Sequence, residues 1–133
     1  MTSNLFQSFA DLATASPQKK AVMAKSDNVY RALTYDEIYK KSVQLGELFI
    51  SLGIHPDDKV SIILENHPKY AVVFFAVMYS QATAVLLDIQ FSPQQVKNLT
   101  MHSDSKVLIV SGKNYAAIKN CVSDEVEVIN IDA

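Results

Sequence analysis

Apolar residues near the start of the chain recur at the spacing of an amphipathic helix. They are Leu5, Phe6, Phe9, Leu12 and Ala13, and they predict a helix over about residues 4–15 that ends before Ser16-Pro17. The pattern then changes to two short extended runs, Ala21 to Lys25 and Val29 to Leu33. Between these runs Ser26-Asp27-Asn28 supplies residues that favour turns, so the sequence predicts a β-hairpin.

A second amphipathic helix is predicted to begin after Thr34. Thr34 and Glu37 have the spacing of a capping box, in which each side chain accepts a hydrogen bond from the other residue's backbone N–H. One apolar stripe follows, made of Tyr35, Ile38, Leu45, Phe49 and Leu52. Gly53 suits a left-handed residue after the helix, Ile54 fits a Schellman ending, and Pro56 prevents continuation.

Gly46 lies inside this predicted helix. Glycine there costs about 1 kcal/mol relative to alanine, so we expect another part of the chain to approach the backbone closely at this position.

From Val60 onward, apolar runs of strand length alternate with runs of helix length. The predicted strands are Val60 to Leu64, Ala84 to Leu87, Val107 to Val110 and Val126 to Ile131, and the predicted helices are Pro68 to Ser80, Ser92 to His102 and Asn114 to Val122. The first three strands are expected to be buried, whereas Glu127 and Asn130 indicate partial exposure of the last. Ser92 and Gln95 form a second capping box, with Pro93 at the first helical position.

This alternation predicts an α/β fold. We expect a Rossmann-like, doubly wound, mostly parallel sheet with helices on both faces, preceded by the short N-terminal helix and hairpin. No repeat, low-complexity stretch or glycine-rich linker interrupts the chain, so residues 1–133 are predicted to form a single domain. A sheet of this kind would normally continue beyond the last predicted strand.

Composition narrows the range of functions. The chain has 133 residues, of which 49% are apolar and 20% charged, as in globular proteins. The net charge of −2 does not provide the basic surface that nucleic-acid binding requires. The longest apolar run, Ala71 to Tyr79, is too short to span a membrane. The single cysteine, Cys121, excludes an internal disulfide and suits a cytoplasmic protein, in which we expect a half-buried structural thiol.

Few residues are candidates for chemistry. The three glycines do not have the spacing of a phosphate-binding loop, and neither GxSxG nor HExxH occurs. His55, His67 and His102 lie far apart, so no metal site is predicted. Beside His67 no nucleophile or carboxylate pair is recognisable, and we expect His67 and Asn66 to cap the following helix instead.

Two segments that contain aspartate are candidates for a functional site. Asp57-Asp58 resembles the acidic pair of a receiver domain, but it precedes a strand, whereas ligands bind beyond the carboxyl ends of parallel strands. We therefore expect a solvated turn. The loop Asp88 to Phe91 follows a strand and leads into the helix opened by Ser92, so an anion could dock there, although a plain capped turn is favoured because the loop has no cation.

Several stretches, taken in order, resemble the N-terminal part of the AMP-forming acyl-CoA synthetases. They are Leu33-Thr34-Tyr35-Asp36-Glu37, Leu52-Gly53-Ile54, Asp58-Lys59-Val60, Glu65-Asn66-His67-Pro68-Lys69-Tyr70, Phe74-Phe75-Ala76-Val77-Met78 and Leu87-Asp88. Two later stretches, Phe91 to Val96 and His102 to Ser111, are similar to the fatty-acid-activating members. The resemblance covers nearly the whole chain.

The resemblance implies a known reaction. The family joins a carboxylic acid to AMP from ATP and magnesium, and then passes the acyl group to coenzyme A. Its phosphate loop, its acidic ATP-binding motif and its catalytic lysine lie beyond the stretch matched here, so the resemblance assigns no catalytic, cofactor-binding or metal-binding residue to this chain. ATP, magnesium and coenzyme A are expected only in the complete enzyme.

The chain also departs from the family pattern. Asp57 and Gln81 stand where the family commonly has glycine, and Leu86 and Ile89 replace prolines. In some members a basic residue of the loop after Asp88 approaches the phosphates of coenzyme A, and Gln90 is its nearest counterpart here.

The sequence therefore predicts the N-terminal segment of an acyl-CoA synthetase, inactive by itself, whose partner is the remainder of the synthetase chain. The alternative is a freestanding α/β interaction or regulatory module. For the isolated segment we expect self-association, through a sheet edge or through an apolar helix face such as that of Leu5, Phe9 and Leu12.

Overall fold

The computed structural model describes residues 4–26, 29–65 and 68–132. These residues form five helices, a two-stranded antiparallel sheet and a four-stranded parallel sheet, which confirms the predicted α/β class. The chain groups into two compact units. The helical unit comprises residues 1–56 and 66–81, and the sheet unit comprises residues 57–65 and 82–133.

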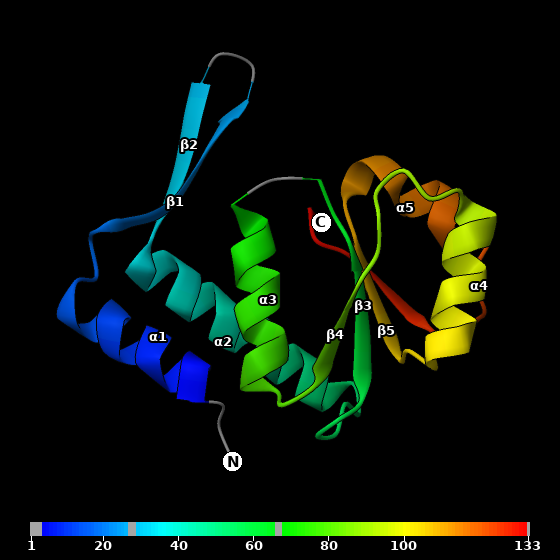
Figure 1. Cartoon of the computed structure of the whole chain (residues 1–133), viewed down its shortest axis with the longest axis horizontal. Coiled ribbons are helices and arrows are strands. Elements are labelled where there is room, and N and C mark those ends of the chain that lie inside the picture. Colours follow the sequence, from blue (N-terminus) through cyan, green and yellow to red (C-terminus); the bar gives the residue numbers. More distant parts are fainter. Residues whose placement is uncertain (1–3, 27–28, 66–67, 133) are drawn as a thin grey trace. The chain divides into compact units, whose positions relative to one another are not determined.

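Three helices pack together in the helical unit: α1 (Asn4–Ala15), α2 (Tyr35–Ser51) and α3 (Lys69–Tyr79) (Figure 1). Aromatic side chains join them. The ring of Phe9 on α1 stacks on that of Phe75 on α3, with centroids 4.0 Å apart, and Phe6 meets Tyr79 edge-on at 5.4 Å. Burial of these rings fixes α1 against α3.

The predicted hairpin is present as β1 (Lys20–Ser26) and β2 (Val29–Thr34), which pair antiparallel. In Figure 1 it extends away from the three helices of its unit. The predicted turn residues Asp27 and Asn28 lie outside the described residues, as do Asn66 and His67, so the expected cap of α3 by the latter two stays a prediction.

Both ends of α2 match their predictions. At the start, the Glu37 amide donates to the Thr34 hydroxyl at 3.1 Å and the Thr34 amide donates to the Glu37 carboxylate at 3.1 Å. At the end, Gly53 has φ +92°, and the amides of Gly53 and Ile54 donate to the carbonyls of Ile50 and Phe49. These two hydrogen bonds define the Schellman ending.

Gly46 is buried in α2 because α3 passes against it. A Cβ atom added at Gly46 would lie 2.5 Å from Cδ1 of Tyr79 and 3.2 Å from the carbonyl oxygen of Ala76. The Tyr79 ring cannot easily move, because it also contacts Phe6 and its hydroxyl donates to the Glu47 carboxylate. The predicted close approach is therefore confirmed.

The sheet unit contains the parallel sheet in the order β4-β3-β5-β6. Its strands are β3 (Lys59–Ile63), β4 (Thr83–Leu86), β5 (Val107–Val110) and β6 (Glu127–Asn130). Two helices complete the unit, α4 (Pro93–Ser103) and α5 (Gly112–Lys119). The capping box of Ser92 and Gln95 at the start of α4 is present as predicted.

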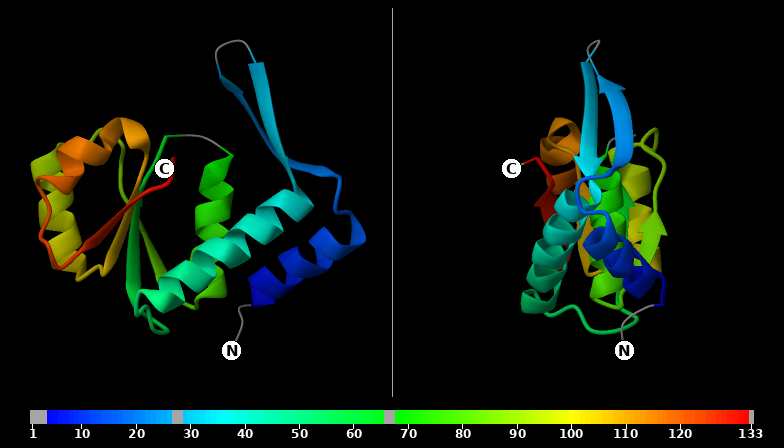
Figure 2. Two further views of the ribbon diagram at one scale, coloured as in Figure 1. Left: turned by 180° about the vertical axis from the view of Figure 1, so that it is seen from behind. Right: turned by 90° about the vertical axis from the view of Figure 1, so that its left-hand side faces the viewer.

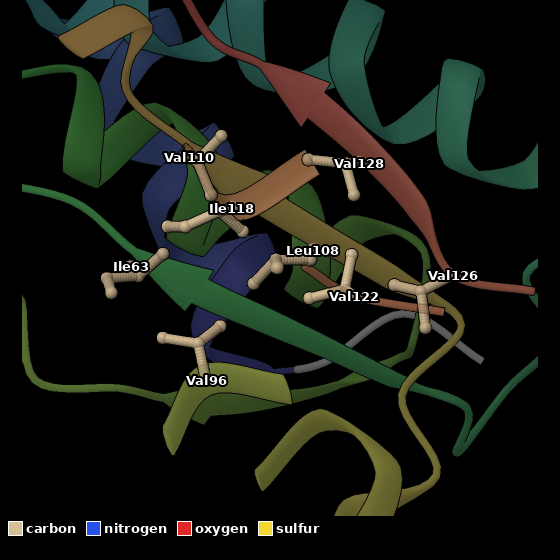
Figure 3. Close-up of a cluster of buried hydrophobic side chains, with 8 residues drawn as sticks. All are labelled: Ile63, Val96, Leu108, Val110, Ile118, Val122, Val126 and Val128. Carbon is tan, nitrogen blue, oxygen red and sulfur yellow. The ribbon is translucent and has the colours of Figure 1, made fainter. Parts of the chain in front are cut away.

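One face of the parallel sheet is covered by α4 and α5 (Figures 1 and 2). Figure 3 shows the side chains that fill the space between them, with Ile63 and Leu108 from the strands, Val96 from α4 and Ile118 from α5. The strand residues that alternate with these, such as Val60, point to the other face and are also buried.

Two element predictions need correction. The run Ala84 to Leu87 was expected to be buried, but β4 is an edge strand and Leu86 is 57% exposed. The helix expected over Asn114 to Val122 begins two residues earlier and ends at Lys119. The Asp132 carboxylate accepts a hydrogen bond of 2.8 Å from the Gly112 amide and thereby supports the earlier start.

Two of the family departures coincide with unusual backbone conformations. Asp57 has φ 70° and Gln81 has φ 63°, which is the left-handed region that favours glycine. A side chain with a Cβ atom is strained there, more so for glutamine than for aspartate, which visits this region more often.

The close packing at Gly46 predicts the effect of a larger side chain. Gly46→Leu should lower the free energy of unfolding by about 1–3 kcal/mol through overpacking, despite the better helix propensity of leucine. Urea denaturation followed by circular dichroism measures this change. Gln44→Leu, at an exposed position of the same helix, is the matched control and should have little effect. Equal stability of the Gly46→Leu and parent proteins would contradict the packing seen here.

The left-handed residues predict a gain in stability. Gln81→Gly should raise the free energy of unfolding by about 1 kcal/mol because it removes Cβ strain, and Asp57→Gly should raise it by less. Gln94→Gly, within the regular backbone of α4, should lower it by about 1 kcal/mol. Thermal unfolding of the three variants tests this order, and a loss of stability in Gln81→Gly would refute it.

Candidate functional site

In sheets of this kind, ligands bind at the carboxyl ends of the parallel strands. Glu65 lies just after β3, and Ser111 and Asn114 lie at the start of the segment after β5. The Glu65 carboxylate accepts hydrogen bonds from the Ser111 hydroxyl at 3.0 Å and from the Asn114 amide nitrogen at 3.2 Å. A single carboxylate thus ties the end of β3 to the start of α5.

A second carboxylate, that of Asp132, joins the end of β6 to the start of α5. Asp132 follows β6 and accepts the hydrogen bond of the Gly112 amide, and the Asp132 amide donates to the Asn130 side chain at 2.9 Å. The exposed amides at a helix start normally attract an anion such as a phosphate. At α5 the chain supplies its own anion, in the form of Asp132.

The chemistry available to this carboxyl-edge cluster (Glu65, Ser111, Gly112, Asn114 and Asp132) is limited. Ser111 is only 6% exposed, and its hydroxyl proton is directed to a carboxylate that already holds a second donor. A nucleophilic serine needs an accessible oxygen and a base free to take its proton. The cluster therefore joins strand ends and does not form a reactive centre.

The loop after β4 is a capped turn. The Gln90 amide donates to the Asp88 side chain at 2.8 Å, and the Phe91 amide donates to the Asp88 carbonyl at 3.0 Å. Ser92 and Gln95 then satisfy one another's amides in the capping box. The sequence left two hypotheses for this loop, an anion-binding site and a plain capped turn. The structure matches the capped turn, in which the Gln90 amide is hydrogen-bonded within the chain.

Asp57 and Asp58 lie at the amino edge of the sheet, as the sequence predicted. The Asp58 carboxylate pairs with Lys106 at 2.9 Å, and the Asp58 carbonyl accepts from the Thr83 amide at 2.8 Å. Asp58 is more enclosed than expected, because its side chain is only 21% exposed. It is a structural residue that links the starts of β3, β4 and β5.

An open groove of about 390 Å³ lies at the same amino edge, beside the C-terminus of α4. Its lining includes Ser105, Lys106 and Glu125. Ser105 continues inward as a chain of hydroxyls, since its oxygen lies 2.6 Å from that of buried Ser61 and 2.7 Å from that of Ser103. These bonds satisfy polar groups inside the unit, and Lys106 is already paired with Asp58.

The remaining candidates stay separate. Cys121 is a free, half-buried thiol, as expected. His55 lies in the loop after α2 and His102 lies on α4, and both are exposed. Within residues 4–26, 29–65 and 68–132, no group of three or more His, Cys, Asp or Glu residues could hold a metal ion. Over the same ranges no helix has the length and apolar character needed to cross a membrane.

No local sequence pattern indicated a role for the four side chains that meet here, which are Glu65, Ser111, Asn114 and Asp132. Their position immediately after predicted strands was a usable signal, because parallel strand ends meet at one edge. The pairing itself depends on the sheet order, which the sequence does not state.

The fold and sequence match known proteins. Residues 9–133 match the family described as AMP-binding enzyme. The chain is 26% identical over 125 residues to 4-coumarate–CoA ligase 1 of Arabidopsis thaliana, covering 94% of this chain and 21% of that protein. It therefore spans about a fifth of the length of this relative.

Two solved structures share the fold. The fatty acid AMP ligase from Legionella pneumophila superposes with a TM-score of 0.85 at 14% identity, over 96% of this chain and 23% of that chain. The fatty acyl CoA synthetase of Mycobacterium tuberculosis gives a TM-score of 0.82 at 21% identity, over 97% and 26% of the two chains. Both cover a small part of a larger protein.

The carboxyl-edge cluster predicts a measurable coupling. Glu65→Ala should lower the free energy of unfolding by about 1–2 kcal/mol, because it leaves the buried Ser111 hydroxyl without its acceptor. In the Ser111→Ala background the same change should cost less. A double-mutant cycle by chemical denaturation measures the difference, with exposed Glu125→Ala as the control. Strict additivity of the Glu65 and Ser111 changes would show that the bond contributes nothing.

Proposed function

We propose that this chain, which belongs to the AMP-binding enzyme family, forms the N-terminal part of an acyl-CoA synthetase that activates fatty acids. The observation that carries the proposal is the extent of the family match, which runs over residues 9–133 while the chain spans only 21% of the plant ligase. Within such an enzyme the segment acts as a scaffold. It supplies a parallel sheet and helices on which the reacting groups of the complete protein are assembled.

The geometry supports a non-catalytic role for the segment itself. Transfer of a phosphoryl or adenylyl group requires donors and cations aimed at the reacting phosphate. At the carboxyl edge, the donors of Ser111, Gly112 and Asn114 are bound by Glu65 and Asp132. ATP, magnesium and coenzyme A would therefore bind to residues that the rest of the enzyme contributes.

The fatty-acid class is the finer part of the proposal. Phe91 to Val96 and His102 to Ser111 resemble the fatty-acid-activating members, and the two structural neighbours described above bear fatty-acid names. The plant relative is a ligase for 4-coumarate, an aromatic acid.

The proposal also includes a cytoplasmic location and a partner, the remainder of the synthetase chain. The single free thiol, Cys121, suits the reducing cytoplasm, and the remainder of the synthetase is the natural partner of this segment. If the natural protein activates no acid, a freestanding interaction module would replace this proposal.

The chain alone should not activate acids. ATP–pyrophosphate exchange by the pure 133-residue protein, with a panel of fatty acids, should stay at background because the chain lacks the phosphate loop and the catalytic lysine of the family. The Mycobacterium tuberculosis fatty acyl CoA synthetase serves as the positive control. Exchange that depends on the added acid and on the pure chain would overturn the scaffold role.

The substrate class can be tested on the natural protein. An antibody raised against the 133-residue chain captures that protein from its source cells, and the captured protein is assayed with fatty acids and with 4-coumarate. Faster exchange with fatty acids is expected. Preference for 4-coumarate would leave the family assignment intact and overturn the fatty-acid class, whereas no exchange with any acid would favour the module.

A further inference from the structure

The edge strand β4 has an unused hydrogen-bonding side. Among the described strands its only partner is β3. Its residues, Thr83-Ala84-Val85-Leu86, include no charge and no proline, and the strand pairs with β3 without a bulge. Native edge strands usually carry one of these devices because an open edge can pair with another chain.

The register of β4 shows which groups are open. The Thr83 amide donates to the carbonyl of Asp58, just before β3, at 2.8 Å, and the Leu87 amide donates to the carbonyl of Ile62 in β3 at 2.9 Å. In a parallel pair, alternate residues direct both backbone groups to the same neighbour, so Val85 also faces β3. Ala84 and Leu86 therefore direct their N–H and C=O groups away from β3, toward the open side.

The other surfaces for self-association are less suitable. The opposite edge strand, β6, carries Glu127, so two copies of that edge would bring charged residues to one interface. The face of α1 named in the sequence prediction is only partly available, because Phe9 is 7% exposed and stacks on Phe75, while Leu12 is 41% exposed. The neutral β4 edge combines open backbone groups with exposed apolar side chains, since Leu86 is 57% and Ile89 37% exposed.

We propose that two copies of this chain pair antiparallel through β4, with the twofold axis at Val85. In this register Ala84 of each copy lies opposite Leu86 of the other. Both of these are hydrogen-bonded pairs, each exchanging two N–H···O=C bonds, while the two Val85 residues form the close, non-hydrogen-bonded pair between them. The two four-stranded sheets thereby become one continuous sheet.

This pairing satisfies every open group that the register identifies. No charge is brought into contact, and each exposed Leu86 gains an apolar neighbour across the strands. The inference does not depend on the proposed enzymatic role, because it rests on the backbone pattern of β4.

Disulfide trapping tests the register. In a Cys121→Ser background, Val85→Cys should form a disulfide-linked dimer under mild oxidation, because the paired Cα atoms would lie about 4.5 Å apart. Thr83→Cys is the control, since residue 83 lies opposite residue 87 and the two copies of residue 83 would be about 13 Å apart. Mixing Thr83→Cys with Leu87→Cys should restore the crosslink. Crosslinking of Thr83→Cys alone, or none with Val85→Cys, would overturn the proposal.

Removal of one open donor tests the hydrogen bonds. Leu86→Pro deletes an N–H that faces away from β3, so the fold should persist while the dimer dissociation constant rises about tenfold or more. Sedimentation equilibrium measures the constant and circular dichroism verifies the fold. Met101→Lys, at an exposed position of α4, should leave dimerisation unchanged. A parent chain that is monomeric at millimolar concentration, or a dimer insensitive to Leu86→Pro, would contradict the pairing.

Discussion

The parallel pairing of β3 with β5 is the interaction on which the sheet unit depends. Val60 to Ile63 and all of β5 are buried, so the side chains on both faces of these strands are shielded from water. Burying each valine or isoleucine contributes about 1.5–3 kcal/mol before the cost of ordering the chain. Parallel strands must be joined by long crossovers, and this requirement explains why helices separate the strands.

The same pairing determines where polar residues meet. Because β3 and β5 run parallel, the residues that follow Ile63 and Val110 emerge at one edge, and Glu65 reaches Ser111 and Asn114 there. Residues before the strands emerge at the other edge, where Asp58 reaches Lys106. Polar side chains of the chain itself therefore join neighbouring strands at both the carboxyl edge and the amino edge of the sheet. A segment built in this way is suited to carry a catalytic apparatus supplied by other parts of a protein.

Local signals allowed much of this structure to be predicted from the sequence. The capping boxes at Thr34 and Ser92 and the ending at Gly53 depend on residues three to five positions apart, and all three are present. Gly46 was predicted to be a site of close packing because glycine has a low helix propensity and yet lies inside a predicted helix. The family comparison marked Asp57 and Gln81 as unusual, and both adopt the left-handed conformation that glycine would prefer.

Features that depend on sheet order could not be predicted in the same way. A run of four apolar residues looks alike in a central strand and in an edge strand, so β4 was wrongly expected to be buried. The start of α5 depends on Asp132, which lies twenty residues away in the sequence. The role of Glu65 likewise appears only when β3 and β5 are known to be neighbours.

The intact mass of the natural protein that contains this sequence tests the central claim most directly. Mass spectrometry of the protein captured from its source cells should give a value several times the 14.7 kDa of this chain, because the scaffold role requires the catalytic part of an adenylate-forming enzyme on the same polypeptide. A natural protein of 14.7 kDa would contradict that account and would favour a freestanding module.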